Sequence, residues 1–597
     1  MNFATFSQTL ESLEKTSSRL EMTYQLAELY QKLDKSEIKA AVYLMQGRLV
    51  PLYESLEFNL SHKMIQRALA RLMEDHQEQS QVEVSTQTNL FGEEDKTQFL
   101  KLVKKRAQET GDLGLTAEKI MTDLQLNLDQ DESILTVFAQ LKKIAQQEGT
   151  GSQDRKIIEL VKLFEQVTPL SARYVTRIIL GKVRLGFSTM TLLDALSWAM
   201  TGDKSDRVAL EEAYNKRADV GDLAQVYLAA PSVAARQQVL ADYTVKNGIP
   251  VVPALAQRLN TTTEVVEKMG QVLVEPKYDG LRVQIHFQHG QPTKAFTRNL
   301  DDVTHMFPEL ETAEAAFNCQ SCILDGEAIG YDDQSGELLP FQKTITRRRK
   351  HDVDSQAAVV PLRFYVFDIL EIDNESLVDQ SLLERKKTLV QIMVEDQTFK
   401  NTTYIQSNDA DQIRQYHQQQ LDQGLEGAIF KTVGGFYRGG RKGWRWVKMK
   451  EAEGDRGKLN DTLDCIVMGY YLGKGKRAEF GLGAILVGVR DEKNEVIKTI
   501  TKIGTGLTDE QLQEMKAKVD QVSTLTKPAA YVVPTTFTPD VWAEPAVVIE
   551  VAADEITQSP SHSAGVALRF PRLINFREDK NWTAATSLAE VAQIEIK

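Results

Sequence analysis

The chain has 597 residues, which is too long for a single hydrophobic core and suggests roughly three or four domains. Its composition, 42% hydrophobic and 26% charged, is that of an ordinary globular protein, and the net charge of −13 argues as a sum against binding a polyanion. No apolar run approaches the roughly 20 residues that cross a bilayer, and the N-terminus lacks the basic start and apolar core of a secretory signal. We therefore expect a cytoplasmic protein without membrane contact.

Basic residues are concentrated locally in spite of the negative net charge. Six of them and no acid lie between Arg438 and Lys450, and two further basic runs lie at residues 343–350 and 473–477. Because these runs contain or flank the motifs described below, an electropositive groove is expected, with a solvated charged surface as the alternative.

The cysteines do not indicate a metal site. Cys319 and Cys322 have C-x-x-C spacing, but a zinc site needs about four ligands, and Cys465 is the one other cysteine. The eight histidines are scattered. Two ordinary thiols in a reducing compartment are therefore expected.

Residues 1–222 are predicted to form an all-α domain. Phe6, Leu10, Leu13 and Leu20 recur at the spacing of one helical face, and proline and glycine are sparse. This periodicity predicts a packed set of amphipathic helices.

One segment of this domain, Ser171–Phe187, is typical of a nucleic-acid contact. Arg173, Arg177, Lys182 and Arg184 follow one another with no acid between them, and two glycines in the same segment permit close backbone approach. Arginines beside exposed backbone N–H groups suit phosphate contacts, which position a duplex without reading its sequence. These four residues are predicted to bind DNA, with an ordinary surface helix as the alternative.

A polar stretch at residues 77–97 lacks periodicity and predicts a loop. Within it, Gln87-Thr-Asn-Leu-Phe91 resembles the short Gln-x-x-Leu-Phe peptide by which bacterial proteins dock on the replicative sliding clamp. The resemblance implies the clamp as a partner.

The pattern changes to strands in residues 223–454. A β-rich run, Gln271 to Glu275, ends at Pro276, and Lys277-Tyr-Asp-Gly280 follows it. From Leu281 to Gln288 apolar and polar residues alternate, which predicts a half-buried strand with Arg282 on its polar side and Arg298 at the end of the return strand.

Lys277 is the candidate nucleophile of this region. A lysine is protonated at neutral pH, and neighbouring cations such as Lys448 and Lys450, together with desolvation, lower its pKa. The freed amine can attack the α-phosphate of a nucleotide and form a phosphoramidate. A solvated surface lysine is the alternative for this motif alone.

Four later stretches follow Lys277 in a fixed order. They are Leu324-Asp325-Gly326-Glu327, Phe367-Asp368, Glu426 to Lys431, and Trp446 to Lys450. In order and spacing the set resembles the nucleotidyltransferase motifs of ATP-dependent DNA ligases, most closely the long archaeal and eukaryotic-type replicative form. The sequence holds no G-x-x-x-x-G-K-[ST] and no G-x-G-x-x-G after a strand, which disfavours P-loop and dinucleotide-binding folds.

The resemblance implies roles for single residues. Lys277 would carry AMP, Glu275 would lie against the adenine mostly through backbone groups, and Phe367 would stack on it. In relatives, a basic residue six positions before the first motif lysine is typically arginine; here Lys442 stands at that position, preceded by Arg441, and either residue fits. The implied ATP-binding residues are Glu275, Lys277, Arg282, Arg298, Glu327, Phe367, Lys442, Lys448 and Lys450.

The same resemblance implies how phosphate charge is handled. Glu327 would hold the ribose hydroxyls or a divalent metal, and Glu426 would help bind the metal. Lys448 and Lys450 would neutralise the α-phosphate in the transition state. A Mg²⁺ requirement also follows from the chemistry, because pyrophosphate must leave a highly charged triphosphate.

Short predicted strands with glycine-rich turns fill residues 455–597, with a helical stretch at Thr508 to Val519, and this arrangement is typical of an OB-fold β-barrel. Near the end, Leu568-Arg-Phe-Pro-Arg572 resembles the C-terminal motif of the same ligases. The resemblance implies that Arg569 and Arg572 orient the leaving pyrophosphate.

The whole pattern is therefore similar to a monomeric, three-domain, ATP-dependent DNA ligase with an all-α DNA-binding domain (1–222), an α+β adenylation domain (223–454) and an OB-fold domain (455–597). Such an enzyme would seal nicks in double-stranded DNA through a lysyl-AMP intermediate, in replication, repair and recombination. The alternatives are another covalent nucleotidyltransferase, either an RNA ligase or a GTP-using capping enzyme, and a catalytically silent DNA-binding scaffold.

Overall fold

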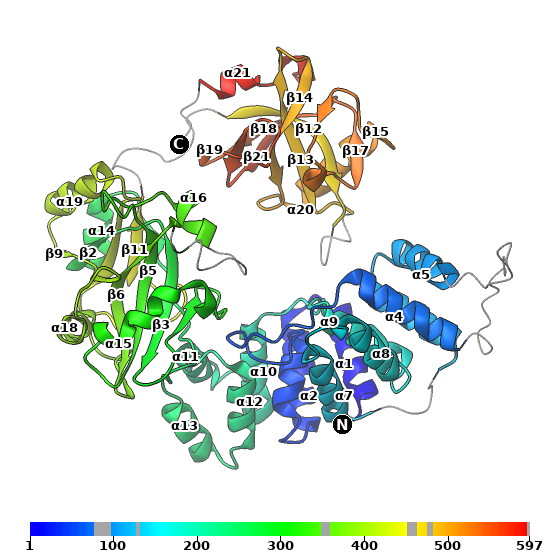
Figure 1. Ribbon diagram of the computed structural model, residues 1–597, viewed down its shortest axis with the longest axis horizontal. Coiled ribbons are helices and arrows are strands. Elements are labelled where there is room, and N and C mark those ends of the chain that lie inside the picture. Colours follow the sequence, from blue (N-terminus) through cyan, green and yellow to red (C-terminus); the bar gives the residue numbers. More distant parts are fainter. Residues whose placement is uncertain are drawn as a thin grey trace. The chain divides into compact units, whose positions relative to one another are not determined.

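The computed structural model divides into two compact units, Met1–Ala452 and Glu453–Lys597, each described here by itself (Figure 1). The peptide at 87–91 that is predicted to bind the sliding clamp lies outside the described residues, as do the basic residues at 348–350 and 474–477. Across the described part of the chain, every helix is too short or too polar to cross a bilayer. The structure describes residues 1–76, 97–126, 132–347, 357, 359–450, 462–473 and 481–593.

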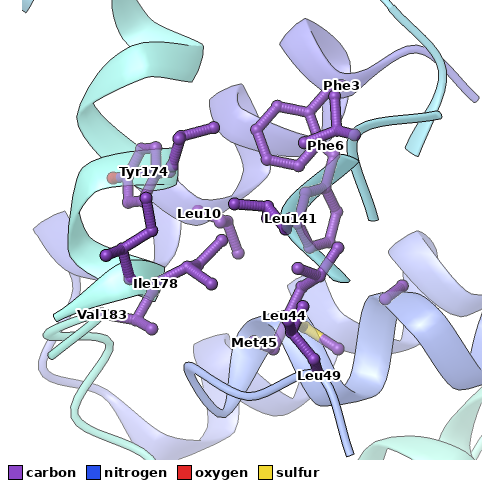
Figure 2. Packing of buried hydrophobic residues seen from close by; sticks show 14 of the residues in the cluster. Phe3, Phe6, Leu10, Leu44, Met45, Leu49, Leu141, Tyr174, Ile178 and Val183 are labelled. Carbon is purple, nitrogen blue, oxygen red and sulfur yellow. The ribbon is translucent and has the colours of Figure 1, made fainter. Parts of the chain in front are cut away.

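The first part of the larger unit is helical. Its helices are α1 (Phe3–Lys15), α2 (Arg19–Lys32), α3 (Ile38–Met45), α4 (His62–Asp75), α5 (Thr97–Thr110), α6 (Leu113–Asp123), α7 (Ile134–Ala145), α8 (Ser152–Phe164), α9 (Pro169–Ile179), α10 (Thr189–Thr201), α11 (Arg207–Lys216), α12 (Val220–Ala229) and α13 (Val233–Asp242). Phe3, Phe6 and Leu10 of α1 are fully buried and share one core with α3, α7 and α9 (Figure 2). The apolar periodicity therefore predicted this core correctly.

The structure differs from the helical prediction in two details. Leu20 is 60% exposed, because α1 ends at Lys15 and Leu20 belongs to the next helix, which begins after the N-cap Ser18. The predicted boundary at residue 222 falls inside α12, and the helical part continues to Asp242.

Arg173 and Arg177 of α9, two of the predicted DNA contacts, lie inside the helical part, with exposed fractions of 8% and 2%. Arg177 Nη1 lies 2.7 Å from Glu14 Oε2 and its Nε lies 3.3 Å from Asp112 Oδ1, while Arg173 Nη2 lies 2.6 Å from Glu14 Oε2. Burial raises the pKa of Glu14, but the two arginines outweigh burial and the pKa is lowered. Guanidinium groups buried against carboxylates are not presented to a phosphate, so this structure gives the prediction that these two arginines bind DNA no support.

Lys182 and Arg184 lie on the surface, in the loop between α9 and α10. Gly181 and Gly186 have φ values of 64° and 74°, the left-handed region that glycine adopts without strain. Arg184 itself has a φ of 66° and pairs with Asp112 at 3.1 Å. The loop therefore exposes these two of the four predicted basic residues.

The second part of the larger unit is built on two sheets. One has the strand order β1-β11-β10-β2-β9 and consists of β1 (Gln257–Arg258), β2 (Val272–Pro276), β9 (Ile405–Ser407), β10 (Ala428–Thr432) and β11 (Trp446–Met449). The other has the order β4-β3-β5-β6-β7, with β8 beside β6, and consists of β3 (Leu281–Gln288), β4 (Lys294–Thr297), β5 (Ser321–Gly330), β6 (Leu362–Ile372), β7 (Glu375–Ser376) and β8 (Phe399–Asn401). Since β2 and β3 belong to different sheets, the turn at 277–280 joins the two.

Helices cover these sheets. Helix α19 packs against β2, β9 and α14, and α18 packs against β6. The helices of this part are α14 (Thr262–Met269), α15 (Ala313–Ala316), α16 (Phe341–Thr344), α18 (Leu382–Ile392) and α19 (Ala410–Asp422).

Strand β3 is covered on both faces, so the prediction of a half-buried strand is wrong. Its polar side chains Gln284 and His286 are 3% and 1% exposed, because the connecting segment (residues 243–256) runs over them. Val251 N donates to Gln284 Oε1 at 2.8 Å, and Gly248 N donates to His286 Nδ1 at 3.0 Å. Burial lowers the pKa of His286 to about 3, which keeps the ring neutral and able to accept this hydrogen bond.

The smaller unit is a curled, mainly antiparallel sheet with helix α20 (Asp509–Asp520). Strand β12 pairs with β13 along one edge and with both β17 and β18 along the other, and its register shifts between Val467 and Gly469. Such a bulge bends a strand, which lets the sheet curl. The predicted helix and the three long strands are confirmed. The strands are β12 (Leu463–Tyr471), β13 (Ala484–Asp491), β14 (Val496–Ile503), β15 (Ser523–Thr524), β16 (Tyr531–Val532), β17 (Val541–Ala543), β18 (Val548–Ala552), β19 (Glu555–Gln558), β20 (Val566–Arg569) and β21 (Arg572–Phe576), followed by α21 (Leu588–Val591).

The buried arginines predict a stability effect. Replacing Glu14 with Gln removes the carboxylate that Arg173 and Arg177 share, and we expect the free energy of unfolding of the helical part to fall by about 3 kcal/mol. Urea titration followed by circular dichroism measures the change. The control Lys32→Gln breaks the exposed Lys32–Glu28 pair and should cost less than about 0.5 kcal/mol. Equal small changes in both variants would show that the buried pairs add no stability.

Candidate functional site

A pocket lies between the two sheets of the larger unit, beside the turn that joins them. Its volume is about 390 Å³, which suits a nucleoside-sized ligand. Strands β2, β3, β5, β6, β10 and β11 all contribute to its wall. The residues singled out in the sequence that line it are Glu275, Lys277, Arg282, Arg298, Glu327, Phe367, Lys431, Arg441 and Lys448.

Lys277 stands where β2 ends, held by backbone hydrogen bonds to the stretch before β10. Lys277 N donates to Gly427 O at 2.9 Å, and Glu426 N donates to Lys277 O at 3.1 Å. Gly427 has a φ of 127°, and a Cβ there would lie 2.1 Å from Met449 O, so glycine is required. These hydrogen bonds fix two stretches against each other although Lys277 and Glu426 are 149 residues apart in the sequence.

The side chain of Glu426 is shared by two lysines. Lys277 Nζ and Lys450 Nζ donate to its two carboxylate oxygens. Burial raises the pKa of Glu426, but these ammonium groups outweigh burial and the net shift is downward. The carboxylate is therefore ionised and orients the Lys277 amine.

Lys448, on β11, lines the pocket beside this group. Desolvation lowers the pKa of Lys448, and the positive charges of Lys450 and Lys277 lower it further. Three lysines thus surround one carboxylate, which leaves an excess of positive charge for an anionic ligand to compensate.

Glu327, on β5, also lines the pocket and interacts electrostatically with Lys277. Burial raises its pKa to about 7, partly offset by Lys277 and Arg282. Gly280 N donates to Glu327 Oε1 at 3.3 Å, which ties the carboxyl group to the turn after Lys277.

Arg282 is oriented by partners within the wall. Its Nε and Nη2 lie 3.1 Å and 2.7 Å from the two oxygens of Asp325, and Nη1 donates to Ala254 O at 2.6 Å. Its guanidinium carbon lies 5.4 Å from the ring centroid of Phe367. The guanidinium therefore stands beside the predicted stacking ring in a fixed orientation, and Arg298 lies at the exposed edge of the pocket.

Glu275 and Lys431 form the closed end of the pocket. They are 2% and 1% exposed, and Lys431 Nζ lies 2.6 Å from Glu275 Oε2. Lys431 Nζ also lies 4.4 Å from the ring centroid of Phe367 and 4.1 Å from that of Trp446. Desolvation lowers the pKa of Lys431 to about 8.

The structure separates Arg441 from Lys442. Arg441 lines the pocket, whereas Lys442 Nζ pairs with Glu211 Oε1 of α11 at 2.6 Å and does not line it. Of the two basic residues left open by the sequence, Arg441 is therefore the one that lines the pocket in this structure.

The last two predicted residues lie in the smaller unit. Arg569 ends β20, with its guanidinium carbon 5.4 Å from the Phe570 ring centroid, and Arg572 begins β21 and pairs with Asp554 at 2.8 Å. Arg173, Arg177, Lys182 and Arg184 belong to the helical part and do not line the pocket.

Sequence reasoning missed Lys386, which lies on α18 behind Glu275. Its Nζ lies 2.5 Å from Glu275 Oε1 and its side chain is 3% exposed. No motif surrounds it, and a lysine on an amphipathic helix gives no local signal that its charge is buried.

Three family models match the chain in order. They are DNA ligase N terminus at residues 2–197, ATP dependent DNA ligase domain at 253–450, and ATP dependent DNA ligase C terminal region at 478–580.

Curated relatives are similar over the full length. A protein named "Probable DNA ligase" of Dictyoglomus turgidum is 36% identical over 603 residues, covering 100% of this chain and 97% of its own. "DNA ligase 2" of Thermofilum pendens is 35% identical over 608 residues, covering 98% and 95%. A solved structure titled "Pmar-Lig_PreS3" shares the fold with a TM-score of 0.51 at 16% identity, covering 96% of this chain and 99% of that one. The chain therefore belongs to the ATP-dependent DNA ligase family.

Proposed function

We propose that this ligase carries AMP on Lys277 while sealing nicks in duplex DNA. The observation that supports it best is the position of Lys277, which lines the pocket and contacts Glu426. Glu275, Lys431 and Phe367 enclose the far end, where the base would lie. Lys448 and Arg298 line the wall where phosphates would emerge.

The first step forms a bond between Lys277 Nζ and the α-phosphorus while the bond to pyrophosphate breaks. Lys277 releases its ammonium proton to water before it attacks as the free amine, while Glu426 stays ionised and orients the amine, and pyrophosphate leaves with the electron pair of the broken P–O bond. Lys448 and Lys450 offset the charge that builds on the phosphate. AMP then passes to the 5′-phosphate at the nick, and the 3′-hydroxyl displaces it.

The two acids predicted to bind metal fit Mg²⁺. Glu327 and Glu426 both lie near Lys277, and among the described residues no cluster of three or more metal-binding side chains occurs. Mg²⁺ commonly binds through one or two carboxylates together with substrate phosphates, so this donor set suits an ion that arrives with ATP. When bound, it would neutralise the triphosphate and stabilise the leaving pyrophosphate.

The remaining assignments concern whole domains. We infer three domains, with the helical one extended to residue 242. We assign the curled sheet of the smaller unit to the OB type because the bulged strand β12 pairs with three others and the sheet shares its core with α20. Arg569 and Arg572 are proposed to orient pyrophosphate, and Lys182 and Arg184 to grip the duplex. A monomer acting in the cell interior, with the sliding clamp as a partner through residues 87–91, stays a prediction.

The nucleophile is tested by labelling. Wild-type protein with Mg²⁺ and α-labelled ATP should take up AMP on a single lysine, and Lys277→Ala should take up none and seal no nicks. Denaturing gels and peptide mapping identify the labelled site. Sealing by Lys277→Ala with ATP would refute the assignment.

The choice between Arg441 and Lys442 as the basic residue that contacts the nucleotide is tested by a matched pair of variants. Arg441→Ala should lower kcat/KM for adenylation by about 100-fold, as expected for loss of a charged contact to substrate. Lys442→Ala, whose side chain pairs with Glu211 outside the pocket, should change it by less than about threefold. The reverse order of effects would restore the assignment of Lys442.

The duplex grip is tested by salt dependence. If Lys182 contacts a phosphate, Lys182→Gln should make the slope of log Kd against log salt shallower by about 0.9 for nicked duplex. Fluorescence anisotropy over a range of salt concentrations measures the slope. Arg173→Gln should not change the slope, because Arg173 is buried against Glu14. Equal effects of both variants would contradict this division.

A further inference from the structure

Helix α18 lies behind the closed end of the pocket and contributes no lining residue. It begins at a capping box formed by Ser381 and Glu384 and packs against β6, the strand that carries Phe367. Two successive residues of this helix, Arg385 and Lys386, are buried, at 0% and 3% exposed. Because burying an unpaired charge is strongly unfavourable, each must have a partner that it holds.

The two side chains hold different strands of the site. Arg385 Nε and Nη2 lie 2.7 Å and 2.9 Å from the two oxygens of Asp368, the residue after Phe367 on β6. Lys386 Nζ lies 2.5 Å from Glu275 Oε1 at the end of β2. One helix thus fixes a residue in each of the two sheets that enclose the pocket.

Glu275 is therefore gripped from two sides. Lys386 contacts Oε1 from behind the wall, and Lys431 contacts Oε2 from within it, at 2.6 Å. Glu275 and Lys431 both line the pocket, and their paired carboxylate and ammonium place an acceptor next to a donor in its wall. Without Lys386, Oε1 of Glu275 would lose its cationic partner, and Lys431 alone would hold the carboxylate.

We propose that Lys386 is a positioning residue for base selection, which fixes the order of acceptor and donor that a purine meets at the closed end of the pocket. The proposal rests on the proposed function, in that the base of ATP occupies this end. Lys386 itself touches no substrate and acts through Glu275.

The order of these groups decides between purines. Adenine presents an amino donor at position 6 and a ring acceptor at position 1, whereas guanine presents an acceptor and a donor at the same positions. A carboxylate and an ammonium held in one order complement one purine and oppose the other at both positions. A site built to hydrogen-bond in this way discriminates strongly, because the wrong base leaves buried polar groups unpaired.

The test compares Lys386→Met with Lys387→Met. Methionine has a similar length without charge, and Lys387 is the exposed neighbour on the same helix, so the pair is matched in sequence position and chemistry. Adenylation kinetics with ATP and with GTP give KM and kcat for each. For Lys386→Met we expect the KM for ATP to rise by about 10-fold, and the ratio of kcat/KM for ATP to that for GTP to fall by about 10-fold. The kcat with ATP should stay within about threefold of the wild-type value. Lys387→Met should match the wild type.

Sealing of a nick that already carries AMP on its 5′-phosphate controls for folding. This step bypasses nucleotide loading, so Lys386→Met should seal such nicks within about threefold of the wild-type rate. Lys386→Gln, a second neutral variant, should behave like Lys386→Met.

The outcomes separate this proposal from the one before it. The role of Lys386 would be overturned if a neutral variant still sealed adenylated nicks and showed an unchanged KM for ATP and an unchanged purine preference. In that case, labelling of Lys277 by ATP would still support Lys277 as the nucleophile. If neither neutral variant seals adenylated nicks, Lys386 serves folding and not base selection, and the proposal is again overturned. If wild-type protein takes no label on Lys277, the proposed function itself fails.

Discussion

The nucleotide pocket depends on two carboxylates, one buried and one half-buried, that are each shared between two lysines. Glu426 contacts Lys277 and Lys450, and Glu275 contacts Lys386 and Lys431. A charged group in a poorly solvated site needs an opposite charge beside it, and here two lysine ammonium groups lie beside each carboxylate. The surplus positive charge is retained inside the pocket, where a triphosphate would supply the missing negative charge. The lysines of the site therefore favour the binding of a polyanion.

This arrangement also explains why the motifs are distant in sequence yet close in space. The joining turn places Lys277 between two sheets, backbone hydrogen bonds fasten it to Gly427 and Glu426, and a glycine at 427 is the one residue type that fits against Met449 O. Each sheet supplies acids and cations from different strands, so neither sheet holds a complete site alone. The site therefore lies between the two sheets and needs residues from both.

Local sequence patterns predicted the secondary-structure elements and most of the residues that line the pocket. These residues belong to motifs at the ends of strands, which can be recognised from a few consecutive positions. The ligase family, the helical first part, the position of β2 and the strands of the smaller unit all followed from such patterns. Where the structure differs from the predictions for basic residues, the cause is the same: each side chain pairs with an acid that is distant in the sequence. Glu14 and Asp112 removed Arg173 and Arg177 from the surface, and Glu211 removed Lys442 from the pocket. Lys386 could not be predicted, since burial of its charge is decided by a strand more than 100 residues earlier in the chain, at Glu275.

The connecting segment over β3 has a consequence for dissecting the enzyme. Residues 247–254 follow the helical part in the chain, yet they satisfy the hydrogen bonds of Gln284 and His286 and give Ala254 O to Arg282. A catalytic fragment cut at the first strand, Gln257, would leave those polar groups uncovered and Arg282 without one of its anchors. The smallest autonomous catalytic piece of this ligase should therefore begin ahead of Asn247, inside what looks like a linker between domains.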